Sequence, residues 1–195
     1  MSSPTTSGDR RRRADAVRNR QRVLEATRTL LADPGATVTV EAIAGKAGVG
    51  AATVVRSFGS KDALIDAAVA ELLEPVIRRA RDALSETSAQ DALRRFLTEL
   101  IAFQSGHWII GEQLRDLDLP STSAQRAALT DIVTELVDRA RDEGAIRTDI
   151  DPSVTMDLIT EVTHAIARSP SASPQLAESY VSVLMDGLRP QRSRA

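Results

Sequence analysis

Two short apolar segments joined by a glycine turn constrain the fold of this chain more than any other feature. The turn is Gly48-Val49-Gly50, and the segments cover residues 40–47 and 51–58. Glycine supplies the positive φ that a sharp turn between two helices requires. Ala44 is small where a second helix would cross, and Val54 would pack that helix back on the first. The pattern predicts a helix-turn-helix, although an ordinary corner between two helices also favours small residues and glycine.

The ends of these helices carry their own signals. Thr39 precedes the first segment and is a good N-cap, and Ser60 can cap a helix that begins at Lys61. An earlier helix is expected over residues 15–31. Asp33-Pro34-Gly35 ends it, because the residue before a proline avoids the α region.

Beyond residue 60 the chain has the pattern of long helices with short breaks. We expect helices over residues 61–84, 88–105, 152–168 and 174–188, and another that begins at Ser121 or Ser123 and runs to Arg141. A short segment is expected over 107–117, and a kink near Pro75. No alternating run with hairpin residues predicts a strand. The fold class is therefore all-α, with about nine helices. We expect a disordered basic arm over residues 1–14, a helix-turn-helix domain over 15–60 and a second helical domain over 61–195.

Charge is distributed unevenly along the chain. The first 61 residues carry 11 Lys and Arg against 5 Asp and Glu, whereas the rest carries 14 against 22. Four of the bases are consecutive, Arg10 to Arg13. A basic head on an acidic body predicts that only the head meets a polyanion, unless the charges merely solvate exposed faces.

The composition excludes several classes of protein. Cysteine is absent, so disulfides, thiol nucleophiles and cysteine zinc sites are excluded. One Glu-x-x-His pair, Glu161 and His164, is too little for a helical di-iron site, and no cofactor or metal is expected. No apolar run reaches membrane-spanning length, and the N-terminal arginines are not followed by the apolar stretch of a secretory signal. The expectation is a cytoplasmic protein that is not an enzyme.

The stretch from Thr39 to Lys61 resembles the DNA-binding domain of TetR-family transcriptional regulators. It matches the pattern T-V-E-x-I-A-x-x-A-G-V-x-x-x-T-x-x-R-x-F-x-S-K, and the similarity covers residues 15–65 or so. The family often has Ser or Thr at the place of Gly50 and an aromatic residue at the place of Val55. The second short helix, over residues 51–58, would be the recognition helix of such a domain. It offers few hydrogen-bonding groups, so direct base readout should be sparse.

The resemblance and the charge pattern together predict the DNA-binding residues. Phosphate contacts are expected from Thr39 and Lys61, which begin helices, and minor-groove contacts from the arginine arm. The full set is Arg10, Arg11, Arg12, Arg13, Thr39, Gly50, Ala51, Ala52, Thr53, Val55, Arg56 and Lys61. Thr53 could equally cap or pack, and the arm could be a solubilising tail.

The resemblance further implies a homodimer whose last two helices pair with their copies. Apolar stripes on these helices allow this arrangement, although a larger monomeric core would show them too. The expected interface is Val154, Leu158, Val162, Ala165, Tyr180 and Leu184, and Val183 can face core or partner.

The helices between the two ends are expected to enclose a site for an unknown small-molecule effector. The expected lining is Phe96, Leu100, Phe103, Gln104, His107, Trp108, Gln113, Leu136 and Arg139. The same residues would also suit an ordinary core. The functional expectation is a repressor that the effector releases from a palindromic double-stranded operator. The alternative is a helical protein–protein interaction module without sequence-specific DNA binding.

Overall fold

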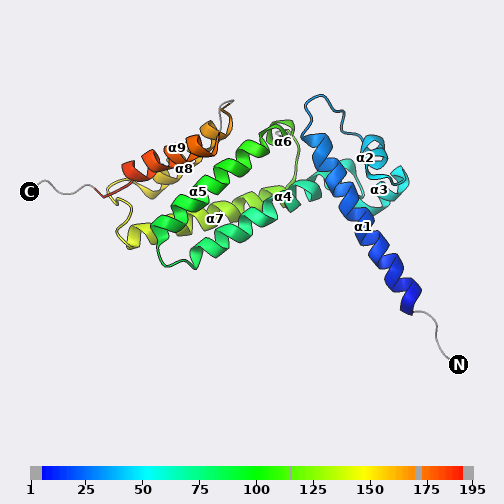
Figure 1. The fold of residues 1–195 in the computed structure, drawn as a ribbon, viewed down its shortest axis with the longest axis horizontal. Coiled ribbons are helices and arrows are strands. Elements are labelled where there is room, and N and C mark those ends of the chain that lie inside the picture. The colour runs from blue at the N-terminus through cyan, green and yellow to red at the C-terminus, as the bar shows by residue number, and fades with distance from the viewer. Residues whose placement is uncertain (1–5, 115, 170–172, 191–195) are drawn as a thin grey trace, which may run out of the picture. The chain divides into compact units, whose positions relative to one another are not determined.

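The computed structural model describes residues 6–114, 116–169 and 173–190. The described residues form helices and no strands, which confirms the all-α class. The helices are α1 (Thr6–Leu31), α2 (Val40–Ala47), α3 (Ala51–Phe58), α4 (Lys61–Leu84), α5 (Ala89–Gly106), α6 (Trp108–Gln113), α7 (Pro120–Asp142), α8 (Pro152–Ala167) and α9 (Pro174–Gly187) (Figure 1).

Short polar side chains begin most of these helices. Thr39 accepts a hydrogen bond from the Ala42 amide at 3.1 Å, and Ser60 accepts one from the Ala63 amide at 3.0 Å. Asp151 caps α8 in the same way, next to a proline in the first turn. Each cap satisfies an amide that the helix itself leaves unpaired, which is why the sequence placed these starts correctly.

The N-terminal boundary is a correction. Residues 6–14 belong to α1, which is continuous from Thr6 to Leu31, so the expected disordered arm over 1–14 is wrong where the structure describes it. Beyond Gly8 no glycine or proline interrupts the segment, and arginine and alanine favour the helix. The rest of the expected arm, residues 1–5, lies outside the described residues.

The chain divides into two compact units. Unit 1 comprises residues 1–71 and 109–122, and unit 2 comprises 72–108 and 123–195. The boundary therefore falls within α4 rather than at its start, where the sequence suggested it. The reason is burial: Leu64 and Ala68, in the first turns of α4, pack into the core of α1, α2 and α3. Pro75 lies inside α4, and it leaves the Glu71 carbonyl at the boundary without its helical hydrogen bond.

Each unit has its own aliphatic core. Unit 1 is built on buried residues of α1 to α4, including Leu24, Ile43 and Val54. In unit 2, α5 packs against both α8 and α9, which also contact each other (Figure 1). The only buried aromatic side chain among the described residues is Phe96, 2 % exposed, as the low aromatic content of the chain led us to expect.

A candidate nucleic-acid interface

The turn between α2 and α3 requires glycine. Gly48 has φ 65° and ψ 39°, the left-handed conformation predicted for this position. Its amide and that of Val49 both bond back to α2, Val49 to the Ala44 carbonyl at 3.0 Å. A side chain here would be strained by the backbone conformation itself.

Packing across this turn sets which face of α3 is free. Ile43, Ala44 and Ala47 of α2 are buried, and Val54 is the buried residue of α3. The opposite side of α3 is open. Ala52, Val55 and Arg56 are exposed there, and Val55 is 48 % exposed.

The polar groups of α3 are partly engaged within the helix. Arg56 donates to Thr53 Oγ1 at 3.4 Å, and Thr53 is only half-exposed. Gly50 caps the helix without a side-chain hydrogen bond. Ala51 packs partly against the unit 1 core. The expected recognition residues therefore share one short helix, and the exposed ones among them are mostly apolar.

Two helix starts offer groups for phosphate. Lys61 is exposed at the first position of α4, where unpaired amides and the helix dipole favour an anion. Thr39 is half-buried, and its hydroxyl oxygen already accepts the Ala42 amide. Its hydroxyl proton remains available to donate, because a hydroxyl can accept and donate at once.

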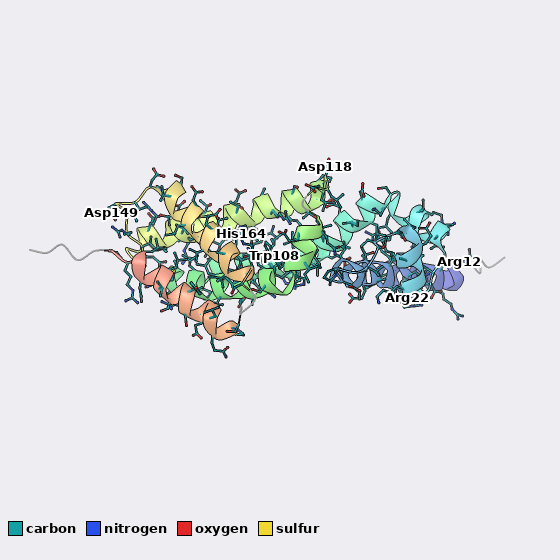
Figure 2. The ribbon with its side chains drawn as sticks, turned by 90° about the horizontal axis from the view of Figure 1, so that it is seen from above. Arg12, Arg22, Trp108, Asp118, Asp149 and His164 are labelled. Carbon is teal, nitrogen blue, oxygen red and sulfur yellow. The ribbon has the colours of Figure 1, made fainter. Side chains whose placement is uncertain are left out.

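The arginines of α1 complete the basic surface. Arg10 to Arg13 are exposed, and Arg12 and Arg22 both project from α1 (Figure 2). Arg20 lies over the Phe58 ring, 4.4 Å from its centroid, and so joins α1 to the end of α3. Arg20 and Arg22 were not among the DNA-binding residues predicted from the sequence. The only available signal was the excess of positive charge, because their position depends on how α1 packs.

Two charged side chains join segments of unit 1 that are far apart in the sequence. Arg28 of α1 bridges Glu71 of α4 at 2.9 Å and also pairs with Glu25. Partial burial alone would lower the pKa of Arg28, but the two carboxylates raise it above its ordinary value. The guanidinium is thus a structural ion pair and not a free DNA contact.

The second contact is a buried carboxylate. Asp66 of α4 is 5 % exposed and accepts the amides of Ser121 and Thr122 at 2.9 and 2.8 Å, together with the Thr122 hydroxyl at 2.8 Å. Burial would raise the pKa of Asp66, but these hydrogen bonds outweigh it and hold the pKa below its usual value. Asp66 therefore caps the start of α7 as an ion.

The expected effector residues are not all brought together. Phe96, Leu100 and Leu136 are buried in the unit 2 core, and Phe103 packs against it. Gln113 lies in unit 1 and donates to the Asp33 carbonyl at 3.3 Å.

Arg139, another expected effector residue, makes structural hydrogen bonds instead. It donates to the carbonyls of Leu84, at the end of α4, and Glu86. Together with its ion pair to Glu143, these bonds tie α7 to the connection between α4 and α5.

Polar and aromatic residues gather around the end of α5. His107 Nδ1 lies 2.8 Å from the Phe103 carbonyl, and the two rings are 4.5 Å apart. Arg168 lies 5.9 Å from the Trp108 ring centroid. The side-chain oxygen of Gln104 is buried without a hydrogen-bond partner.

The expected dimer residues fall into two groups. Val154, Leu158 and Tyr180 are 53 %, 43 % and 48 % exposed, and Ala165 is exposed as well. Val162 is half-buried against the core. Leu184 is buried in the core of its own chain, so the prediction that it faces a partner is not supported. Val183, 71 % exposed, adds to the outer face instead.

Two known protein families match this chain, one in its N-terminal part and one in its C-terminal part. Residues 23–68 match the family described as bacterial regulatory proteins of the tetR family, and residues 88–190 match the C-terminal domain of SbtR-like transcriptional regulators. No functionally curated protein shows a significant match.

Solved structures of similar proteins extend over almost the whole chain. A TetR transcription regulatory protein from Mycobacterium vanbaalenii is 32 % identical, with a TM-score of 0.63 over 91 % of this chain and 98 % of that one. A TetR transcriptional regulator from Streptomyces coelicolor is 26 % identical, with a TM-score of 0.64 over 89 % and 99 %. FadR from Bacillus subtilis, solved in complex with stearoyl-CoA, shares the fold at 17 % identity, with a TM-score of 0.74 over 87 % and 99 %.

The described residues show neither a metal-binding cluster nor a membrane-spanning helix. Among the residues that the structure describes, no three His, Asp or Glu side chains gather in a way that could hold a metal ion. No helix in the described part of the chain is long and apolar enough to cross a membrane.

Proposed function

Because the chain belongs to the TetR family of DNA-binding transcriptional regulators, which are transcription factors and not enzymes, we propose that it is an effector-responsive repressor. It binds a palindromic operator in the cytoplasm as a homodimer. The observation that carries this proposal is the exposed face of α3, which lies in the chain between the helix starts at Thr39 and Lys61, in the basic part of the sequence.

The homodimer is supported by the outer face of α8 and α9. Val154, Leu158, Tyr180 and Val183 leave large apolar side chains exposed on two helices that lie side by side (Figure 1). Large apolar side chains left exposed on neighbouring helices are typical of a protein interface. A second copy of the same face covers it symmetrically and presents two recognition helices to two half-sites.

The effector response is supported by unit 2. We place the effector beside Phe103, Gln104, His107 and Trp108, at the end of α5 and the start of α6. The buried oxygen of Gln104 lacks a partner, and a small molecule with a hydrogen-bond donor would satisfy it. FadR, which shares the fold, has been solved with stearoyl-CoA, so this architecture holds small molecules in at least one relative.

Release requires a difference in affinity between two states. The effector must bind the DNA-incompetent state more tightly, because equal affinity for both states shifts nothing. Helix α4 begins in unit 1 and continues into unit 2, so it is one of the segments that pass from one unit to the other. A tenfold loss of operator affinity needs only about 1.4 kcal/mol of coupling.

The proposal is tested by selecting bound duplexes from a random pool with the full-length protein. We expect an inverted repeat with half-sites about one helical turn apart, and two protomers or a multiple of two on each duplex by sedimentation. The enriched duplex, placed after a promoter, should lower transcription when the protein is present. A pool without enrichment, or binding of one protomer, would contradict the proposal.

A further inference from the structure

The outer face of α3 has an unusual chemistry for a helix that reads DNA. Ala52, Val55 and Arg56 are spaced three and four residues apart and form its exposed stripe. Val54 alone is buried, on the opposite side. Two of the three outward side chains therefore end in methyl groups and can neither donate nor accept a hydrogen bond.

The fold does not account for a valine at position 55. The side chain is 48 % exposed, so it contributes little to the core, and valine favours a helix less than alanine does. Its neighbours on the stripe do not cover it, because Ala52 is small and Arg56 turns toward Thr53. The side chain is free to be covered by something outside the chain.

The hydrogen-bonding capacity of this face is correspondingly small. Gly50 has no side chain, and Thr53 Oγ1 accepts from Arg56 at 3.4 Å. On the stripe, Arg56 is the residue that can donate to a base, with guanine as its usual partner. In the major groove the matching apolar group is the 5-methyl of thymine, which separates thymine from every unmethylated base.

We propose that α3 reads its half-site chiefly through thymine methyl groups, with Val55 and Ala52 as the specificity-determining residues. This inference rests on the proposed operator function and names what the operator must contain. Val55 and Ala52 cover the methyl groups of thymines in each half-site. Arg56 adds a guanine next to them. Affinity comes mainly from phosphate contacts, and discrimination comes mainly from the methyl groups.

The expected size of the effect follows from methyl burial. Covering one methyl group contributes about 0.8 kcal/mol, which corresponds to about a fourfold change in affinity. A dimer meets each position twice, so changing both half-sites gives about 16-fold if the two contributions add. These are several-fold effects, smaller than the loss of a bidentate arginine contact.

The test begins with the half-site that the full-length protein enriches from a random duplex pool. Each thymine is then replaced by uracil, which removes the methyl group and leaves every hydrogen-bonding group in place. We expect about a fourfold loss per half-site at one or two positions. Binding within twofold of the thymine duplex at every position would overturn the inference, as would an enriched half-site without thymine.

A variant assigns the effect to its residue. Val55→Ala should weaken binding to the thymine duplex several-fold and abolish the penalty for uracil at one position, because the two changes remove the same contact. Ser57→Ala is the matched control, since Ser57 is exposed on α3 but lies off the stripe. It should keep the full penalty. An unchanged uracil penalty in Val55→Ala would overturn the assignment to Val55.

Cytosine provides the converse experiment. Cytosine is placed at a position where uracil weakens binding. Replacing that cytosine by 5-methylcytosine should raise the affinity of the duplex about fourfold. No gain there would overturn the inference. Failure of the pool to enrich any sequence would instead remove the operator function itself, so the two failures can be told apart.

Discussion

Two exposed apolar faces, one on α3 and one on α8 and α9, differ in the charge of the chain around them. Val55 lies in the first 61 residues, where bases outnumber acids by 11 to 5. Leu158 and Tyr180 lie in the remainder, where acids outnumber bases by 22 to 14. A polyanion is attracted to the first region and repelled by the second. An exposed apolar face indicates an interaction surface, and the charge of the surrounding sequence indicates which kind of partner binds there.

The largest effect should come from a charge on the α8–α9 face. Leu158→Glu would bury two unpaired carboxylates in the proposed dimer, at a cost of about 3–5 kcal/mol. We expect monomers by analytical ultracentrifugation and a loss of operator affinity of a hundredfold or more. The thermal unfolding of the monomer should change little, because Leu158 is 43 % exposed.

Thr160→Glu is the control for this variant. Thr160 is exposed on the same helix but points away from the Val154–Leu158 stripe. The Thr160→Glu variant should remain dimeric. A stable Leu158→Glu dimer would show that the partner of this face is something other than a second copy.

The next largest effect concerns Asp66, a buried residue that belongs to neither of the two exposed faces. Asp66→Asn removes a buried carboxylate that accepts two amides and a hydroxyl, and it should lower the free energy of unfolding by about 1–3 kcal/mol. Urea denaturation at pH 7 measures this loss. Asp62→Asn is the control, an exposed aspartate in the first turn of the same helix.

The contribution of Asp66 should also depend on pH. Its pKa in the folded protein lies below the ordinary value of 3.8, so folding favours the ionised form. The stabilisation is fully present above pH 3.8 and is lost as the pH falls through the lower, folded pKa. Asp66→Asn should flatten the acid side of the stability profile, and an unchanged profile would contradict the capping role.

Lys61→Ala sharpens the contrast between phosphate and base contacts. We expect a several-fold loss of affinity for every duplex, with the salt dependence of log K reduced by about one unit for each protomer. Val55→Ala should instead weaken the operator alone and leave the salt dependence unchanged. Fluorescence anisotropy over a salt series measures both, and an unchanged slope for Lys61→Ala would exclude a phosphate contact.

The smallest effect concerns the proposed effector site. Trp108 is the single tryptophan of the chain, so its fluorescence reports on this place alone. Arg168→Gln removes the cation from the Trp108 ring and should lower the free energy of unfolding by about 0.5–1 kcal/mol. The fluorescence emission of Trp108 should shift in this variant, while dimerisation and operator binding stay unchanged. A spectrum identical to that of the parent would show that the contact is not maintained in solution.

Much of the DNA-binding unit could be predicted from sequence because its signals are local. Thr39 and Ser60 cap helices within three residues of themselves, and Gly48 needs its left-handed conformation whatever surrounds it. The periodicity of apolar residues likewise predicted most helices in the rest of the chain. Both kinds of signal act over a few residues of backbone, so no knowledge of packing is needed.

Other features depend on contacts between residues far apart in the chain. Asp66 meets Thr122 across 56 positions, and Arg20 meets Phe58 only because the fold of unit 1 brings α1 near the end of α3. Leu184 and Tyr180 look equally suited to an interface in the sequence, yet one is buried in its own core and the other is open. A helical stripe shows that a face is apolar. What covers that face is decided by the packing of whole helices, which local pattern does not encode.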